Sequence, residues 1–198
     1  MKSRFREYAE SIIAAVVLAL IIRSFVIQAF KIPSGSMLPT LLVGDHILVN
    51  KFIYGIKIPF TDIKIFPLRS PRRGDIIVFR YPMDKKKDFI KRVVGVEDDV
   101  VEIRDKVVFI NREPWKDNYG VHKDSATLPG SVSPRDNFGP VTVPEDSLFT
   151  LGDNRDQSRD SRFFGFIALE KVKGRAIIIS FSWDGEKVRW GRIGRDIK

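Results

Sequence analysis

Apolar residues follow two different patterns along this chain of 198 residues. Near the N-terminus, 11 consecutive positions, residues 12–22, are apolar or small, which is typical of a helix in apolar surroundings. After Lys31, short runs rich in Val, Ile and Phe alternate with charged residues and are divided by turn residues, as in β-strands. The runs predicted as strands are residues 45–49, 75–81, 88–96, 99–103, 106–110, 147–153, 175–183 and 187–193. We therefore expect a mainly β fold, in which a single N-terminal transmembrane helix precedes one antiparallel β domain.

The N-terminal run is long enough for a membrane anchor. As a helix, residues 9–30 would extend over roughly 33 Å, enough to cross the hydrocarbon core of a bilayer. Arg23 lies towards the end of this stretch, where its side chain can reach the interface. Three basic residues that precede the run favour a cytoplasmic N-terminus: Lys2, Arg4 and Arg6. The expected parts are a cytoplasmic tail, a transmembrane anchor and an extracytoplasmic domain, residues 1–8, 9–30 and 31–198.

Two other interpretations of the N-terminal run stay open at this point. It is also compatible with a buried helix of a soluble domain, or with a cleavable signal peptide, which has a basic start and an apolar core of similar length. Cleavage requires small residues at positions −1 and −3. A cut after Ala29 would place the bulky Ile27 at −3, so we favour an uncleaved anchor.

Composition excludes several kinds of site. The chain has no cysteine, so it has no thiolate nucleophile, disulfide or thiolate metal site. Its two histidines, His46 and His122, are far apart and lack metal-ligand spacing, and we expect no metal. The formal net charge is +9, but basic residues are dispersed and the longest run is only residues 85–87. We therefore do not expect nucleic-acid binding.

Two segments carry candidate catalytic groups. In KIPSGSMLPT, residues 31–40, Ser36 follows a glycine in a turn flanked by prolines, and Ser34 lies two residues earlier. The same composition also occurs in ordinary linkers. Lys91 belongs to the predicted strand 88–96; if it is buried, loss of hydration would lower its pKa and make it a base able to deprotonate a serine. The alternative is a lysine on a solvated strand face.

A third segment is dense in charge. GDNRDQSRDSRFFGF, residues 152–166, places six charged residues within ten positions, 153–162, and their signs alternate. Three arginines compete for the carboxylates, which disfavours a metal site. The pattern is compatible with a solvated loop or with a rigid polar network beside a site.

The segments IPSGSMLPTLLVGDHILVNK, RRGDIIVFRYP, DFIKRVVGV and GDNRDQSRDSRFFGFI occur in this order behind the apolar run. Together they resemble the boxes of the bacterial type I signal peptidases. The resemblance implies a membrane-anchored serine endopeptidase that removes signal peptides from exported preproteins with a Ser/Lys dyad and no cofactor. It also implies cleavage after small residues, Ala-x-Ala, by a mainly β catalytic domain.

The resemblance assigns roles residue by residue. Ser36 would be the nucleophile and Lys91 the general base, and the oxyanion hole would combine the Ser36 backbone N–H with the Ser34 hydroxyl. Ser158 would hydrogen-bond the Lys91 amine and orient it. Two ion pairs would stiffen the site, namely Asp153 with Arg92 and Asp160 with Arg162. Four residues would line the apolar pockets for the small substrate residues: Phe30, Ile32, Met37 and Ile90.

The implied partners are preprotein signal peptides, bound as an added β-strand, the lipid bilayer, and a secretion translocon close by. The implied location is the bacterial cytoplasmic membrane, with one span, the N-terminus inside and the catalytic domain outside. Residues 111–142 are predicted to form a long polar connection or an extended hairpin. Several aromatic residues either contact lipid or pack internally: Phe52, Tyr54, Phe60, Trp183 and Trp190.

Three rival functions remain from the sequence. A self-cleaving repressor of the Ser/Lys class would need a DNA-binding domain where this chain has its apolar run. A non-catalytic anchored β domain that binds anionic partners would not need Ser36. A peptidase of the mitochondrial inner membrane would share the chemistry in another compartment, and the extended third segment, residues 152–166, favours the bacterial enzyme.

Overall fold

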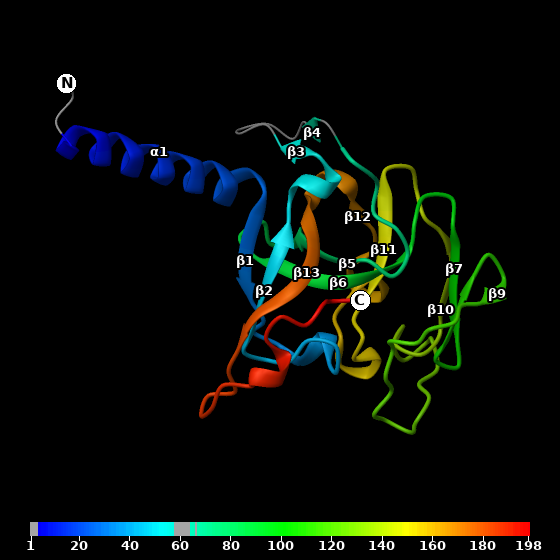
Figure 1. Cartoon of the computed structure of the whole chain (residues 1–198). Coiled ribbons are helices and arrows are strands. Elements are labelled where there is room, and N and C mark those ends of the chain that lie inside the picture. The colour runs from blue at the N-terminus through cyan, green and yellow to red at the C-terminus, as the bar shows by residue number, and fades with distance from the viewer. Residues whose placement is uncertain (1–3, 58–63, 66) are drawn as a thin grey trace.

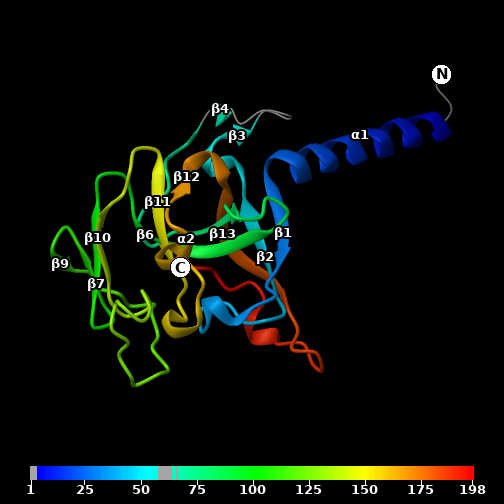
Figure 2. The same cartoon turned by 180° about the vertical axis from the view of Figure 1, so that it is seen from behind.

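The computed structural model describes residues 4–57, 64–65 and 67–198. A long helix, α1 (Arg4–Phe25), projects away from a β domain that contains the rest of the described chain (Figure 1). Within the domain, one large sheet lies next to α1 and a smaller sheet lies on the far side, as the view from behind also shows (Figure 2). The mainly β, antiparallel architecture predicted from the sequence is confirmed.

The large sheet has seven strands in the order β1-β2-β13-β5-β6-β11-β12, and every neighbouring pair is antiparallel. Its strands are β1 (Ile27–Lys31), β2 (Asp45–Asn50), β5 (Ile76–Arg80), β6 (Asp88–Gly95), β11 (Ser147–Leu151), β12 (Ile167–Ala168) and β13 (Val172–Ser182). The last long strand, β13, lies between β2 and β5. Because of this insertion, strands from the N-terminal third of the chain and strands from the middle of the chain belong to one sheet.

The smaller sheet has four strands in the order β10-β7-β8-β9. Its strands are β7 (Val100–Arg104), β8 (Val107–Ile110), β9 (Glu113–Pro114) and β10 (Phe138–Thr142), and a separate pair is formed by β3 (Ile56–Lys57) and β4 (Lys64–Ile65). Because β9 and β10 occupy opposite edges of the sheet, the idea that residues 111–142 form an extended hairpin is wrong. We call residues 115–137, between these two strands, the connecting segment.

Short helices make the turns between strands. They are η1 (Gly35–Met37), η2 (Phe52–Tyr54), η3 (Arg155–Gln157), α2 (Ser161–Phe164), η4 (Leu169–Lys171) and η5 (Trp190–Arg192). The predicted strand at residues 187–193 is wrong, because this stretch contains only one isolated bridge residue, Val188, and the turn η5. The turn is favoured because Arg192 reaches back to the buried carboxylate of Asp45, 2.5 Å away.

The predicted helix, residues 9–30, extends further towards the C-terminus than the helix in the structure. The helix stops at Phe25, and Ile27–Lys31 is a strand that pairs with β2 in register from Ile27 opposite Asn50 to Lys31 opposite His46. The β-branched and aromatic residues of this stretch gain backbone partners in the sheet. Within the described ranges, no helix has both the length and the apolar character needed to cross a membrane.

The core consists of three apolar clusters, and one of them lies under the N-terminal strands. This cluster contains Ile32, Met37, Leu41 and Ile47 among its buried members, and Phe30 and Ile90 pack against it. The turn, residues 31–40, is therefore anchored in the core by apolar side chains near both of its ends. A linker would have no such attachment, so the structure rules out the linker interpretation of this segment.

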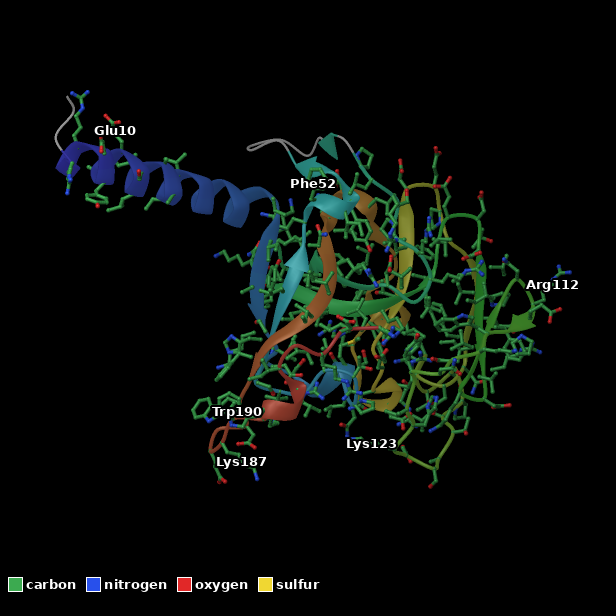
Figure 3. The ribbon with its side chains drawn as sticks, viewed as in Figure 1. Glu10, Phe52, Arg112, Lys123, Lys187 and Trp190 are labelled. Atoms are coloured by element: carbon green, nitrogen blue, oxygen red, sulfur yellow. The ribbon has the colours of Figure 1, made fainter. Side chains whose placement is uncertain are left out.

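The aromatic residues considered for lipid contact fall into different classes. Tyr54 is buried and donates a 2.8 Å hydrogen bond to Asp75, so it belongs to the interior. Trp183 and Trp190 are exposed, and Figure 3 places Trp190 at the end of the domain away from the entry of α1, whereas Phe52 lies near that entry. Phe60 lies outside the described residues.

Candidate active site

Ser36 is held in the turn η1 by contacts from a distant part of the chain. The backbone N–H of Asn154 donates to the carbonyl of Ser36 at 3.1 Å, and the Asn154 side-chain amide donates to the carbonyl of Gly35 at 3.0 Å. A Cβ added at Gly152 would lie 2.5 Å from the Ser36 carbonyl oxygen, so only glycine permits this approach. The segment 152–162, which we call the charged loop, thus packs directly on the serine turn.

Lys91 reaches the same turn from β6. This strand lies between β5 and β11, and Lys91 is opposite Ile77 of β5. Its side chain is only 3% exposed, which rules out the interpretation as a lysine on a solvated face. The Nζ atom lies 2.7 Å from Ser36 Oγ and donates to the carbonyl of Ile90 at 3.0 Å.

Burial changes the charge of this amine. Loss of hydration lowers the pKa of Lys91 from its ordinary value of 10.5 to about 8, because the ammonium form is disfavoured in a dry environment. The carboxylates of Asp160 and Asp153 act against this shift, while Arg162 adds to it. At mildly alkaline pH a substantial fraction of Lys91 is therefore neutral and has a lone pair to accept the proton of the neighbouring hydroxyl.

The predicted ion pair of Asp153 with Arg92 is present and fully buried. Arg92 Nε and Nη2 donate to the two carboxylate oxygens at 2.8 and 2.7 Å, and Nη1 donates to the carbonyl of Gly74 at 2.8 Å. Thr40, at the end of the serine turn, also donates to Asp153 at 2.5 Å. The bidentate geometry fixes both side chains and ties the serine turn to β6 through one carboxylate.

The second predicted pair, Asp160 with Arg162, is also present. Arg162 Nε and Nη2 each donate to the Asp160 carboxylate at 2.8 Å, and Asp160 accepts from the Gly152 N–H at 3.0 Å. Asp160 also caps α2, since its side chain accepts from the Arg162 N–H. These bonds close the charged loop on itself, so the alternative of a solvated loop is wrong.

One predicted contact is absent, and one predicted donor is free to bind an incoming group. Ser158 is buried, but its Oγ has no hydrogen-bond partner in the described part of the chain, so the predicted bond from Ser158 to Lys91 is absent. Instead, Lys91 uses the Ile90 carbonyl. Ser34 is exposed, has extended backbone angles and makes no side-chain capping bond to η1, which leaves its hydroxyl open to an incoming group.

The four predicted pocket residues belong to one cluster but not to one surface. Ile32 and Met37 are 2% and 0% exposed, whereas Phe30 and Ile90 are only partly buried and pack against them. The buried pair thus forms the support, and Phe30 and Ile90 keep part of their surface exposed. Ile32 and Met37 are both enclosed, and the assignment of the four residues to substrate pockets stays a prediction.

Comparison with known proteins places the chain in a family. A model of the family described as signal peptidase, peptidase S26, matches residues 5–181. The chain belongs to the signal peptidase family. Signal peptidase I of Pseudomonas fluorescens is 38% identical to it over 95% of this chain and 78% of that protein. The enzyme of Leptolyngbya laminosa is 40% identical over 89% of this chain and 79% of its own length.

A solved structure is also similar: a signal peptidase I from Enterococcus faecalis V583 shares 33% identity over 54% of this chain and 97% of that one, with a TM-score of 0.44. The predicted resemblance to bacterial type I signal peptidases is confirmed by the family match and the relatives. This signal peptidase is accordingly a serine peptidase that acts on the signal peptides of preproteins.

Sequence reasoning missed several residues of this peptidase's site. Asn154 and Thr40 lie inside the quoted segments, but nothing local shows that they bind the serine turn and Asp153. Tyr119 lies in the connecting segment, and its ring centroid is 3.6 Å from the guanidinium carbon of Arg92. No spacing or composition in that segment indicates such a contact.

The fold also assembles a group of potential metal ligands that sequence spacing does not reveal. Donor atoms of His122, Asp136 and Asp156 lie within 4.8 Å of one another. The oxygens of Asp136 accept from Arg135, and Asp156 accepts from two backbone N–H groups. These carboxylates already have cationic and N–H partners, so the donor set does not fit a metal ion.

Proposed function

We propose that this peptidase removes signal peptides with Ser36 as nucleophile and Lys91 as general base. The observation that carries the proposal is the 2.7 Å contact between Ser36 Oγ and the amine of Lys91, a residue that is only 3% exposed. A serine hydroxyl is a weak nucleophile until a base accepts its proton. Burial supplies a lysine with the required lone pair, and no histidine is needed.

In the proposed reaction, Lys91 accepts the Ser36 proton while Oγ attacks the carbonyl carbon at the end of the signal peptide. The protonated amine then donates to the departing amine of the mature protein, which leaves an acyl group on Ser36. Water, deprotonated by the same lysine, releases the signal peptide and restores the serine. Lys91 thus alternates between base and acid, and the lowered pKa suits both roles near pH 8.

We assign the oxyanion hole to the Ser36 backbone N–H and the Ser34 hydroxyl. The Ser36 carbonyl and the Gly35 carbonyl already accept from Asn154, which orients the turn rigidly. Ser34 has an exposed side chain beside it. Donors held in place before the reaction stabilise developing negative charge without having to reorganise.

We also propose that Phe30 and Ile90 select small substrate residues. Both are partly exposed on strands β1 and β6, and both rest on the closed cluster of Ile32 and Met37, which leaves little depth. A substrate strand would present alternate side chains, positions −1 and −3, to this shallow surface. Alanine fits such a surface, and a larger side chain would have to displace packed residues.

The test is cleavage of a preprotein with an Ala-x-Ala site. We expect cleavage after the second alanine, and a change of the −1 alanine to leucine should reduce kcat/KM by about 10- to 100-fold, the effect of overfilling a packed site by about 1–3 kcal/mol. The matched control is leucine at −2, whose side chain points away, and it should be cleaved normally. Equal cleavage of all three substrates would contradict the proposed specificity.

We further propose that α1 attaches the enzyme to a membrane, close to the point where the secretion translocon releases preproteins. Among the described side chains of α1, the exposed apolar ones include Ile12, Ile13, Val16 and Val17. The helix projects beyond the domain (Figures 1 and 2), so lipid can cover these side chains without disturbing the sheet. Lys2, Arg4 and Arg6, which precede the apolar run, favour a cytoplasmic N-terminus and a catalytic domain on the outer side.

Vesicle flotation checks this attachment. The wild type should float with phospholipid vesicles, whereas the double variant Ile13→Lys/Val17→Lys, which places two charges on one helix face, should remain largely unbound. The control Val107→Lys changes an exposed valine of the small sheet and should float like the wild type. Unchanged flotation of the double variant would remove α1 from this role.

A further inference from the structure

The connecting segment is bound along its length to the charged loop. The Val121 N–H donates to the Asp153 carbonyl at 2.8 Å, the Arg155 N–H donates to the Val121 carbonyl at 3.0 Å, and Val121 forms a parallel bridge with Asn154. The N–H groups of Lys123 and Asp124 both donate to the Asp156 carboxylate at 2.7 Å. A segment predicted from the sequence as a polar connection is thus packed against the charged loop, and Figure 3 shows Lys123 at the lower edge of the domain.

A tight turn in this segment directs Tyr119 towards the site. Asp117 accepts from the N–H groups of Tyr119 and Gly120 at 3.2 and 2.9 Å, which folds the chain back over three residues. Asp117 also forms an ion pair with the buried Arg155 of the charged loop. A Cβ at Gly120 would lie 2.6 Å from the Arg155 guanidinium carbon, so any larger residue here would displace the Arg155–Asp117 pair.

The ring of Tyr119 covers the guanidinium of Arg92. The ring centroid lies 3.6 Å from the guanidinium carbon, a stacking distance, while the edge of the same guanidinium binds both oxygens of Asp153. Arg92 is 0% exposed, and the half-buried Tyr119 supplies one face of its enclosure. Stacking on an aromatic face and bidentate binding to a carboxylate are compatible uses of a planar guanidinium.

We propose that Tyr119 is a positioning residue for peptide-bond cleavage, acting through Arg92 and Asp153 on the serine turn. Asp153 accepts from Thr40 at the end of that turn, and its neighbour Asn154 holds the Ser36 carbonyl. The same carboxylate raises the pKa of Lys91 against the effect of burial. A shift of Arg92 would move Asp153, and would therefore affect both the position of the serine turn and the pKa of Lys91. The inference rests on the proposed dyad, and it adds a residue from a segment to which no catalytic role was assigned.

Three substitutions test the proposal. Tyr119→Leu removes the aromatic face but keeps apolar volume, and kcat for preprotein cleavage should fall about tenfold with KM within twofold of the wild type. Tyr119→Phe keeps the ring over Arg92 and should retain at least half of the wild-type kcat. The matched control is Phe109→Leu, which removes a similar stack at 3.9 Å on the exposed Arg104 of the small sheet, and it should leave kcat unchanged.

Thermal unfolding of each variant is measured in parallel, and kcat is determined well below the lowest Tm. The proposal is overturned if Tyr119→Leu keeps a normal kcat, if Tyr119→Phe is as impaired as the leucine variant, or if Phe109→Leu loses as much activity. Failure of the dyad assignment gives a different result, because an active Ser36→Ala enzyme would contradict the dyad whatever the Tyr119 variants do.

Discussion

Replacing Ser36 by alanine should abolish signal peptide cleavage, with a loss in kcat of about 10⁶-fold, as expected when the nucleophile of a serine peptidase is removed. The physical reason is that, within the described residues, the Lys91 amine bonds Ser36 Oγ and the Ile90 carbonyl and no other hydroxyl. The alanine variant keeps the turn, since its backbone still accepts from Asn154. Measurement of preprotein cleavage in detergent or vesicles, together with vesicle binding, checks the result.

Two serine variants serve as comparisons. Ser34→Ala removes the proposed oxyanion donor but leaves the nucleophile, and it should lower kcat by about 10²- to 10³-fold. Ser180→Ala removes an exposed hydroxyl that only bonds the His46 carbonyl, and its activity should be normal. Near-normal turnover by Ser36→Ala would refute the nucleophile assignment, and an unaltered rate for Ser34→Ala would exclude that hydroxyl from the oxyanion hole.

Replacing Lys91 by methionine should eliminate activity and at the same time stabilise the fold. The folded pKa of about 8 lies below the ordinary 10.5, so the unfolded chain binds a proton in this pH range that the folded chain has lost. The free energy of unfolding of the wild type therefore rises with pH from about 8 to 10.5, and the penalty is complete below pH 8. Its size is about 3 kcal/mol, so the methionine variant should gain up to this amount at pH 7 and progressively less above pH 8.

The wild-type rate gives a second view of the same group. In the proposed mechanism the neutral amine is the base, so kcat/KM should increase with pH through about 8, and Lys91→Arg should be inactive, since a guanidinium stays protonated. Lys173→Met is the control: this lysine is partly exposed and pairs with Asp88 at 2.7 Å, so its loss should neither stop cleavage nor stabilise the protein. A rate independent of pH between 6 and 9 would argue against Lys91 as the base.

The alternation of apolar and charged residues was sufficient to locate most strands. Seven of the eight predicted runs contain a strand, because side chains on a pleated strand point to opposite faces and leave a period of two. The pattern failed at residues 187–193, where the buried Asp45 carboxylate attracts arginines into a turn. It also failed at residues 27–30, whose apolar residues suit a helix or a strand until β2 supplies a hydrogen-bonding partner.

For the candidate site, too, some features were predicted from the sequence and others were found only in the fold. The motifs identified Ser36, Lys91 and the two ion pairs, because these residues lie in segments with a family resemblance. They did not predict that Lys91 and Arg92, adjacent in one strand, are both buried, which requires cover on both faces of β6. They also predicted a bond from Ser158 to Lys91 that the fold replaces with the Ile90 carbonyl.

By itself, the amino-acid sequence determined the β architecture, the apolar N-terminal run and the candidates for the reacting groups, since each depends on residues close together in the chain. Only the tertiary structure decided which of these groups meet. Ser36 and Lys91 are 55 residues apart, and they come together because β13 enters the sheet between β2 and β5 and the charged loop closes over the serine turn. The desolvation of Lys91 and the stacking of Tyr119 on Arg92 follow from that packing, because both depend on neighbours that the local sequence does not contain.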